Sequence, residues 1–107
     1  MSTPNEPPKT TLALRAPGNT GLQVSEVALG TWGIGAGAYG PVTTAQFEDT
    51  VRAAWDAGIT TFDVSPSWGD GIAEKRLGLA LGEDLNKATL VVRAGQMMSE
   101  GRLQGHF

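Results

Sequence analysis

The hydrophobic positions of the chain first show strand-like patterns. Apolar and polar residues alternate on both sides of a turn-rich stretch, which predicts a β-hairpin at residues 11–24. Mostly apolar runs at 26–32, 59–64 and 88–93 predict three further strands. The run at 59–64 has no polar residue except threonine before its end, a pattern typical of a strand in a parallel sheet.

Two other stretches follow the helical period. The first is predicted to begin after Thr43, which forms a capping-box pattern with Gln46, and to end at Gly58. The second covers residues 72–81 and is closed by Gly82. Their apolar faces consist of Phe47, Val51, Ala54 and Trp55 in the first helix and of Ala73, Leu77, Ala80 and Leu81 in the second.

The order of these elements is hairpin, strand, helix, strand, helix, strand. It predicts an α/β fold with parallel strands joined by right-handed crossovers. We expect the ordered part to span residues 11–94. Residues 1–10 contain three prolines and predict a disordered tail, and residues 95–107 have no consistent period and predict an irregular one.

Composition limits the classes of function. A net charge of −3 argues against nucleic-acid or anionic-membrane binding. The chain has no cysteine and a single histidine, His106, which argues against disulfides, thiolate catalysis and a multi-histidine metal site. It has no apolar run of the roughly 18 residues that a membrane span needs and no apolar signal-peptide core, so we expect a cytoplasmic protein.

A glycine-rich stretch lies between the first predicted strand and the first helix. Residues 35–40 match G-x-G-x-x-G, and Asp63 follows about 20 residues later, which suggests a dinucleotide-binding Rossmann unit. In that motif the strand leads directly into the first glycine and the helix opens at the last, whereas residues 31–34 and 41–43 intervene here. We therefore favour a flexible loop that bends over a ligand.

Asp63 lies where the apolar run 59–64 ends. A carboxylate is costly to bury without a partner, and ligands of α/β proteins collect at the carboxyl ends of the strands. Asp63 is therefore the first candidate for a site residue. Tyr39 and His106 are more plausible as packing or exposed residues, and Ser65 and Ser67 have no nearby histidine in the sequence to activate them.

A series of short motifs runs in order through residues 11–95. The motifs are Gly21-Leu22-Gln23-Val24-Ser25, Leu29-Gly30-Thr31-Trp32-Gly33, Gly58-Ile59-Thr60-Thr61-Phe62-Asp63, Trp68-Gly69-Asp70-Gly71, Glu74, Leu77-Gly78 and Leu81. This series resembles the N-terminal part of the aldo-keto reductase family. The resemblance implies a (β/α)8 barrel closed at its bottom by an N-terminal hairpin. It also implies reduction of aldehydes and ketones, or oxidation of alcohols, with NADPH or NADH.

The resemblance assigns catalytic positions. The family uses a tyrosine as proton donor, tuned by a lysine that pairs with an aspartate. Asp63 matches the aspartate, but Trp68 stands at the tyrosine position and Arg93 at the lysine position. An indole N–H does not release a proton at usable pH, and a guanidinium does not replace an ammonium group. We expect an Asp63–Arg93 pair, which is either a structural ion pair or a ligand-facing group.

The resemblance also assigns a cofactor site. NADP would contact the end of the first strand, at Gly30, Thr31 and Trp32, together with Asp63. Trp32 is either a wall of the substrate site or an aromatic cap on the core. In the family most contacts to the nucleotide phosphates and adenosine come from the last loops of the barrel, which this chain does not supply.

A (β/α)8 barrel takes about 250 residues, so we predict a partial barrel with its hairpin and about three βα units. Its two edge strands would be open, and self-association through these edges is expected. The predicted function is that of a truncated and impaired aldo-keto reductase-like protein acting on small carbonyl compounds or alcohols. The alternative is a catalytically silent relative that binds a ligand or partner, or a non-functional fragment.

Overall fold

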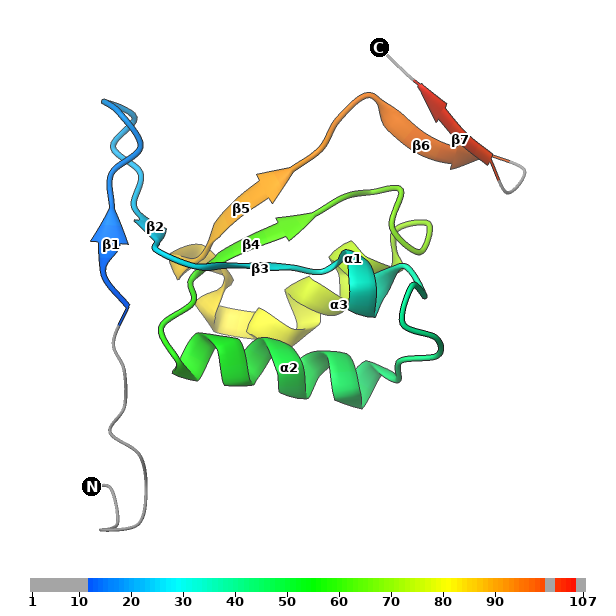
Figure 1. The fold of residues 1–107 in the computed structure, drawn as a ribbon, viewed down its shortest axis with the longest axis horizontal. Helices are drawn as coiled ribbons and strands as arrows, with labels where there is room; N and C mark the ends of the chain where they lie inside the picture. Colours follow the sequence, from blue (N-terminus) through cyan, green and yellow to red (C-terminus); the bar gives the residue numbers. More distant parts are fainter. Residues whose placement is uncertain (1–11, 100–101, 106–107) are drawn as a thin grey trace, which may run out of the picture.

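The computed structural model describes residues 12–99 and 102–105, and Figure 1 shows its course. The strands are β1 (Leu14–Arg15), β2 (Val24–Ser25), β3 (Ala28–Gly30), β4 (Thr61–Val64), β5 (Thr89–Val92), β6 (Gln96–Ser99) and β7 (Arg102–Gly105). The helices are α1 (Trp32–Gly35), α2 (Thr44–Asp56), α3 (Ile72–Leu81) and the 3-10 helix η1 (Gly82–Lys87). The predicted tail at 1–10 and His106 lie outside the described residues.

The central sheet has the order β3-β4-β5, with all three strands parallel. Helix α2 connects β3 to β4, and α3 connects β4 to β5; both helices lie against the same face of the sheet in Figure 1. This arrangement confirms the α/β prediction and the order of its elements. The described residues form part of a barrel wall and no closed barrel.

The core lies between this sheet and the two longer helices. Phe62 and Val64 of β4 are buried in it, together with the predicted inward faces of the helices. The helical members are Phe47, Val51, Ala54, Ala73, Leu77, Ala80 and Leu81. Trp55 is only partly buried and packs at the margin of this core. Its ring stacks on that of Phe62 with a centroid distance of 6.3 Å.

The predicted helix boundaries are confirmed. Thr43 Oγ1 accepts a hydrogen bond from the Gln46 backbone N–H at 3.1 Å, and Gln46 Oε1 accepts one from the Thr43 N–H at 2.9 Å. Gly58 follows the end of α2 with φ 96°, and Gly82 follows α3 with φ 53°. Both glycines have a positive φ, which glycine adopts at low steric cost, and the ψ of −123° at Gly82 lies outside the left-handed helical region.

The predicted N-terminal hairpin is also present, as the antiparallel pair β1–β2. Ser25 ties it to the central sheet, because its Oγ lies 3.2 Å from the Thr61 backbone N and its own N–H donates to Thr61 Oγ1 at 3.0 Å. Thr89 Oγ1 donates to the Gln23 carbonyl at 2.8 Å. The hairpin therefore attaches where β4 and β5 begin. Asp63 lies at the opposite end of the sheet, where the strands finish.

Glu26 fastens the same hairpin from its outer side. Its carboxylate accepts a hydrogen bond from the Ala13 backbone N–H at 2.8 Å and one from Arg15 at 3.4 Å. These two hydrogen bonds, the backbone one first, lower the pKa of the Glu26 carboxyl below its ordinary value because both favour the charged form.

The expected strand at 26–32 is corrected at its end. Strand β3 stops at Gly30, and residues 32–35 turn into the short helix α1, where the Gly35 N–H donates to the Thr31 carbonyl at 2.8 Å. A Cβ on Gly35 would lie 2.5 Å from the Cβ of Ala73, so only glycine allows α1 to sit this close to α3. This tertiary contact leaves no periodic signal in the sequence.

The expectation of an irregular segment at 95–107 is wrong for its described part. Strands β6 and β7 pair antiparallel, with Met98 opposite Leu103. The two strands are separated in the sequence by only two residues, one of them a glycine. A two-residue connection that contains glycine is itself a hairpin signal, and it was missed because neither flanking strand alternates clearly.

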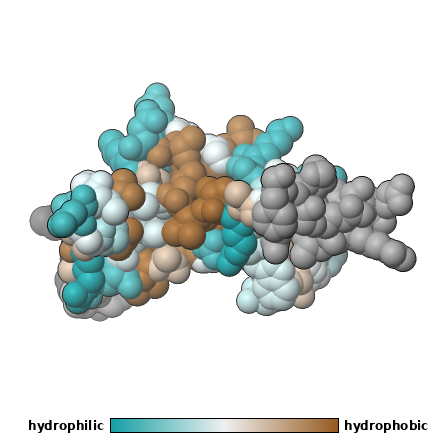
Figure 2. All heavy atoms as spheres, turned by 90° about the horizontal axis from the view of Figure 1, so that it is seen from above, coloured by the Kyte–Doolittle hydropathy of each residue, from teal (hydrophilic) through white to brown (hydrophobic). Residues whose placement is uncertain are grey.

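Figure 2 views the molecule from above the orientation of Figure 1 and shows hydrophobic surface in the middle of this face. The apolar residues of β5 are exposed: Leu90 at 40%, Val91 at 51% and Val92 at 52%.

In the described part of the chain, none of the helices combines the length and the apolar character that crossing a membrane requires. The cytoplasmic location stays a prediction.

Candidate functional site

The candidate site lies at the C-terminal edge of the central sheet, where β3, β4 and β5 end side by side. In the parallel register Asp63 is the partner of Gly30 on one side and of Val91 on the other. Arg93 lies two residues beyond Val91, so it emerges on the same face of the sheet as Asp63. The register therefore brings together the three strand ends that carry the predicted site residues.

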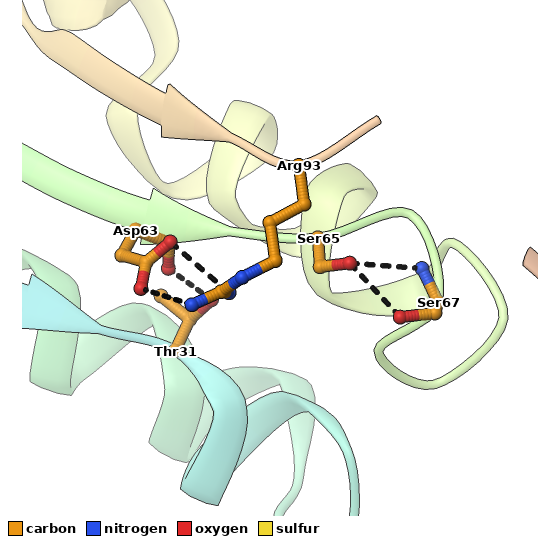
Figure 3. A network of polar contacts seen from close by, with 5 residues as sticks. All are labelled: Thr31, Asp63, Ser65, Ser67 and Arg93. Atoms are coloured by element: carbon orange, nitrogen blue, oxygen red, sulfur yellow. Dashed lines mark hydrogen bonds and ion pairs between the residues drawn. The ribbon is translucent and has the colours of Figure 1, made fainter. Parts of the chain in front are cut away.

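Asp63 and Arg93 form the predicted ion pair, which Figure 3 shows from close by. The two terminal nitrogens of the guanidinium lie 3.3 Å and 3.2 Å from the two carboxylate oxygens. The side chains are 29% exposed for Asp63 and 46% exposed for Arg93. This paired geometry uses the planar fork of arginine, which a lysine cannot reproduce.

Trp68 contacts the same guanidinium. The Cζ atom of Arg93 lies 4.8 Å from the centroid of the indole ring, within the range of a cation–π interaction. Sequence reasoning treated the tryptophan and the arginine as two separate departures from the family pattern. The structure shows that they are in contact, so the cation is held between a carboxylate and an aromatic ring.

Thr31 and Trp32 line the end of β3 beside Asp63. Thr31 is fully buried, and both its backbone N–H and its hydroxyl donate to the Asp63 carbonyl at 3.0 Å. Trp32 begins α1 and is 53% exposed, so it does not cap the core. Gly30 faces open space, because nothing lies within 4 Å of the position of a Cβ. Roles of these residues in catalysis or cofactor binding stay predictions.

The loop between β4 and α3 folds back on itself and onto α1. The hydroxyls of Ser65 and Ser67 lie 2.9 Å apart, and the Ser67 N–H donates to the Ser65 hydroxyl (Figure 3). Ser65 is fully buried, so it serves the turn and is not an accessible nucleophile. Gly69 has φ 64°, and its Cβ would lie 2.5 Å from the carbonyl oxygen of Gly35.

The glycine-rich stretch is a loop, as favoured above. Helix α2 begins only at Thr44, and the loop reaches it through left-handed Gly37 and Gly40, so the glycines and the helix N-terminus do not form one phosphate cradle. The Tyr39 ring lies against Gly33 and is 76% exposed. With the start of α3, the loop lines an open hollow of about 290 Å³.

Among the described residues, no three histidine, cysteine, aspartate or glutamate side chains gather closely enough to hold a metal ion.

Over residues 26–103 the sequence matches the model of the aldo/keto reductase family. The chain belongs to this family. A solved structure described as a putative aldo-keto reductase from Pseudomonas aeruginosa superposes with a TM-score of 0.78 at 31% sequence identity. This likeness covers 92% of the present chain and 38% of the other. The central sheet and its helices therefore match part of the family's TIM barrel.

Two curated relatives extend the comparison. Pyridoxal 4-dehydrogenase of Microbacterium luteolum is 40% identical over 82% of the chain, and L-galactose dehydrogenase of Arabidopsis thaliana is 46% identical over 67%. The matches cover 25% and 22% of those two proteins. The chain thus spans about a quarter of the length of these relatives, and it has oxidoreductase homologues of the aldo-keto reductase type.

Proposed function

We propose that this chain is the N-terminal portion of an aldo-keto reductase-like oxidoreductase whose carbonyl chemistry is impaired. The observation that carries the proposal is the cluster of Asp63, Arg93 and Trp68. The guanidinium is bonded to the Asp63 carboxylate and lies over the Trp68 indole. A proton donor with an adjustable pKa is therefore missing from the position where the family resemblance requires one.

The impairment follows from proton transfer. When a hydride reaches a carbonyl carbon, the oxygen must gain a proton, and a well-placed acid contributes about 10²–10⁴ in rate. An indole N–H donates a hydrogen bond without releasing its proton, and arginine remains charged. Polarisation of the carbonyl by these donors would persist, whereas the proton delivery would not.

The cofactor and substrate class come from the family and its relatives. We propose NADP as the cofactor, with Gly30, Thr31 and Trp32 at the end of β3 beside Asp63. The names of the two dehydrogenase relatives support a small alcohol or carbonyl compound as the substrate. Because the chain spans about a quarter of their length, turnover requires βα units beyond the three strands described here.

A chimera tests the impairment separately from the missing length. In the Pseudomonas aeruginosa reductase, the matched region is replaced by residues 26–95 of this chain, and consumption of NADPH with a simple aldehyde is measured. We expect little reduction by this chimera and a gain of at least about 10²-fold when Trp68→Tyr and Arg93→Lys are introduced together. Trp55→Tyr in α2 is the matched control, and it should leave the rate of NADPH consumption by the chimera unchanged.

Two outcomes would contradict the proposal. One is a chimera that reduces the aldehyde equally well with and without the restored tyrosine and lysine. The other is a folded double variant that stays inactive.

A separate titration tests nucleotide binding by the short chain. Titration of the full 107-residue chain with NADPH, followed by nucleotide fluorescence, should show no micromolar binding.

The alternative function is a catalytically silent relative that binds a ligand. It is favoured by the direct contact between Trp68 and Arg93, because a permanently charged guanidinium over an indole ring suits binding better than proton transfer. In that case nucleotide or carbonyl ligands would bind to the chimera without turnover. Introducing Trp68→Tyr together with Arg93→Lys would then weaken the binding.

A further inference from the structure

The hollow between the glycine-rich loop and the start of α3 has no part in the function proposed above. Its volume is about 290 Å³, and it is lined by four glycines, five apolar residues and a single charged residue, Arg76. Neither Asp63, Arg93 nor Trp68 belongs to its lining. The hollow is therefore a place on the molecule distinct from the cluster at the end of the sheet.

Arg76 gives this hollow its chemical character. Its side chain is half-buried, and its Nη1 donates a hydrogen bond to the Val42 carbonyl at 2.8 Å. Within the described residues no carboxylate forms an ion pair with Arg76, whereas Arg52 and Arg93 each pair with an aspartate. A guanidinium has five N–H donors, and the bond to Val42 uses one of them. Arg76 thus combines partial burial with donors that an anion can use.

The walls of the hollow are held by contacts within the chain. The hydrogen bond from Arg76 ties the end of the loop to α3, and the Gly40 N–H donates to the Gly37 carbonyl at 3.0 Å inside the loop. On the other wall, Gly69 lies so close to the Gly35 carbonyl oxygen that a Cβ would come within 2.5 Å of it. A ligand would therefore meet a site whose shape is already formed, which lowers the entropic cost of binding.

We infer that this hollow binds a small monocarboxylate with a short apolar body, and that Arg76 is its anchor. The planar fork of a guanidinium matches the two oxygens of a carboxylate. One cation balances one negative charge, which suits a carboxylate better than a phosphate. The apolar lining, with Ile34, Pro41 and Ile72, suits the rest of such a ligand. The inference requires no chemistry at Asp63 and no bound nucleotide.

The experiment titrates the full 107-residue chain, isotope-labelled for NMR, with hexanoate. The backbone amides of the lining residues Gly35, Gly37 and Gly69 should shift and reach saturation. Two further probes separate the charge from the apolar body: hexanol has the body without the charge, and inorganic phosphate has charge without the body. Each should bind at least about tenfold more weakly than hexanoate, the loss expected when a charge-assisted hydrogen bond or its apolar support is removed.

Variants identify the anchor. Arg76→Gln should weaken hexanoate binding at least about tenfold. Lys75→Gln is the matched control, because it removes the same charge from the neighbouring residue, which does not line the hollow, and it should leave the affinity unchanged. Since Arg76→Gln also alters the bond to Val42, Ile72→Asp provides an independent test. An acidic residue in the first turn of α3 suits the helix, yet it would repel hexanoate and abolish its binding at an unchanged unfolding temperature.

Several results would overturn the inference. Hexanoate could leave the amides of the lining glycines unshifted, or hexanol or phosphate could bind as tightly as hexanoate. Equal affinities in Arg76→Gln and Lys75→Gln would show that the guanidinium is not the anchor, and undiminished binding to folded Ile72→Asp would place the ligand elsewhere. Because the titration measures binding at the hollow and no turnover, its outcome is independent of the activity of the chimera.

Discussion

At the residue scale, the site is defined by one cation with two partners. Arg93 binds the Asp63 carboxylate through two nitrogens, and its Cζ lies over the Trp68 ring, 4.8 Å from the centroid. The paired contact with the carboxylate depends on the planar fork of arginine, so the residues at the lysine and tyrosine positions are in direct contact and act on the same cation.

A double-mutant cycle measures this contact. Trp68→Ala and Arg93→Ala should each lower the stability of the chain, and their combination should reveal a coupling of about 0.5–1 kcal/mol, the range for an exposed cation–π pair. Urea unfolding followed by circular dichroism provides the free energies. Tyr39→Ala removes an exposed aromatic residue of the glycine-rich loop and should show no coupling to Arg93→Ala. Additive effects of Trp68→Ala and Arg93→Ala would show that the ring and the cation are independent.

At the scale of the elements, side chains near the strand starts hold the hairpin to the sheet. Ser25, Thr61 and Thr89 connect β2 to β4 and β5 from inside, and Glu26 connects the strands of the hairpin from outside. Removing a Ser25–Thr61 hydrogen bond leaves buried polar groups unsatisfied, whereas the Glu26 hydrogen bonds depend on a titratable carboxylate. The Glu26 hydrogen bonds are therefore the part of the hairpin whose contribution to stability depends on pH.

The lowered pKa of Glu26 determines the sign of this response. A carboxyl group whose pKa is lower in the folded state stabilises that state above its ordinary pKa, and the contribution is lost as the pH falls through the folded value. Hydrogen exchange of the hairpin amides should therefore be slower in the original chain than in Glu26→Gln at neutral pH. The difference should vanish in acid below the ordinary range of a glutamate. Glu48→Gln on the exposed side of α2 is the control, and an equal difference at all pH values would contradict the prediction.

At the scale of the whole molecule, one core between the central sheet and its helices holds the fold together. Gly35 joins α1 to this core, since a Cβ there would lie 2.5 Å from Ala73 Cβ and 3.4 Å from the Phe47 ring. Because Ala73 and Phe47 are both fully buried, neither can move without disturbing the rest of the core. A defect at Gly35 is therefore expected to affect global unfolding.

A pair of glycine substitutions tests this dependence. Gly35→Ala should lower the free energy of unfolding by about 1–3 kcal/mol because it overpacks the contact with α3. Gly78→Ala in α3 has open space for its methyl group and an ordinary helical backbone, so it should raise stability by up to about 1 kcal/mol. Urea unfolding measures both changes. Equal effects of the two substitutions would show that the packing at Gly35 does not matter.

The periodic elements could be predicted because their signals are local. The capping box at Thr43, the glycines that end the two helices and the apolar runs of β4 and β5 all lie within a few residues of the structure they specify. Helix α1 escaped prediction because it depends on contact with α3. The pairing of β6 with β7 was missed because the short connection was given less weight than the weak alternation of the strands.

The sequence by itself determined the family, the order of the strands and the pairing of Asp63 with Arg93, because parallel strands that follow each other in a βα series end at the same edge. Only the tertiary structure decided that the Arg93 guanidinium lies over the Trp68 ring, that Trp32 is exposed, and how far the apolar side chains of β5 are exposed. These three features depend on how a loop folds back and on what covers a strand. Neither the path of a loop nor the cover of a strand is specified by spacing along the chain, since both arise from contacts between distant segments.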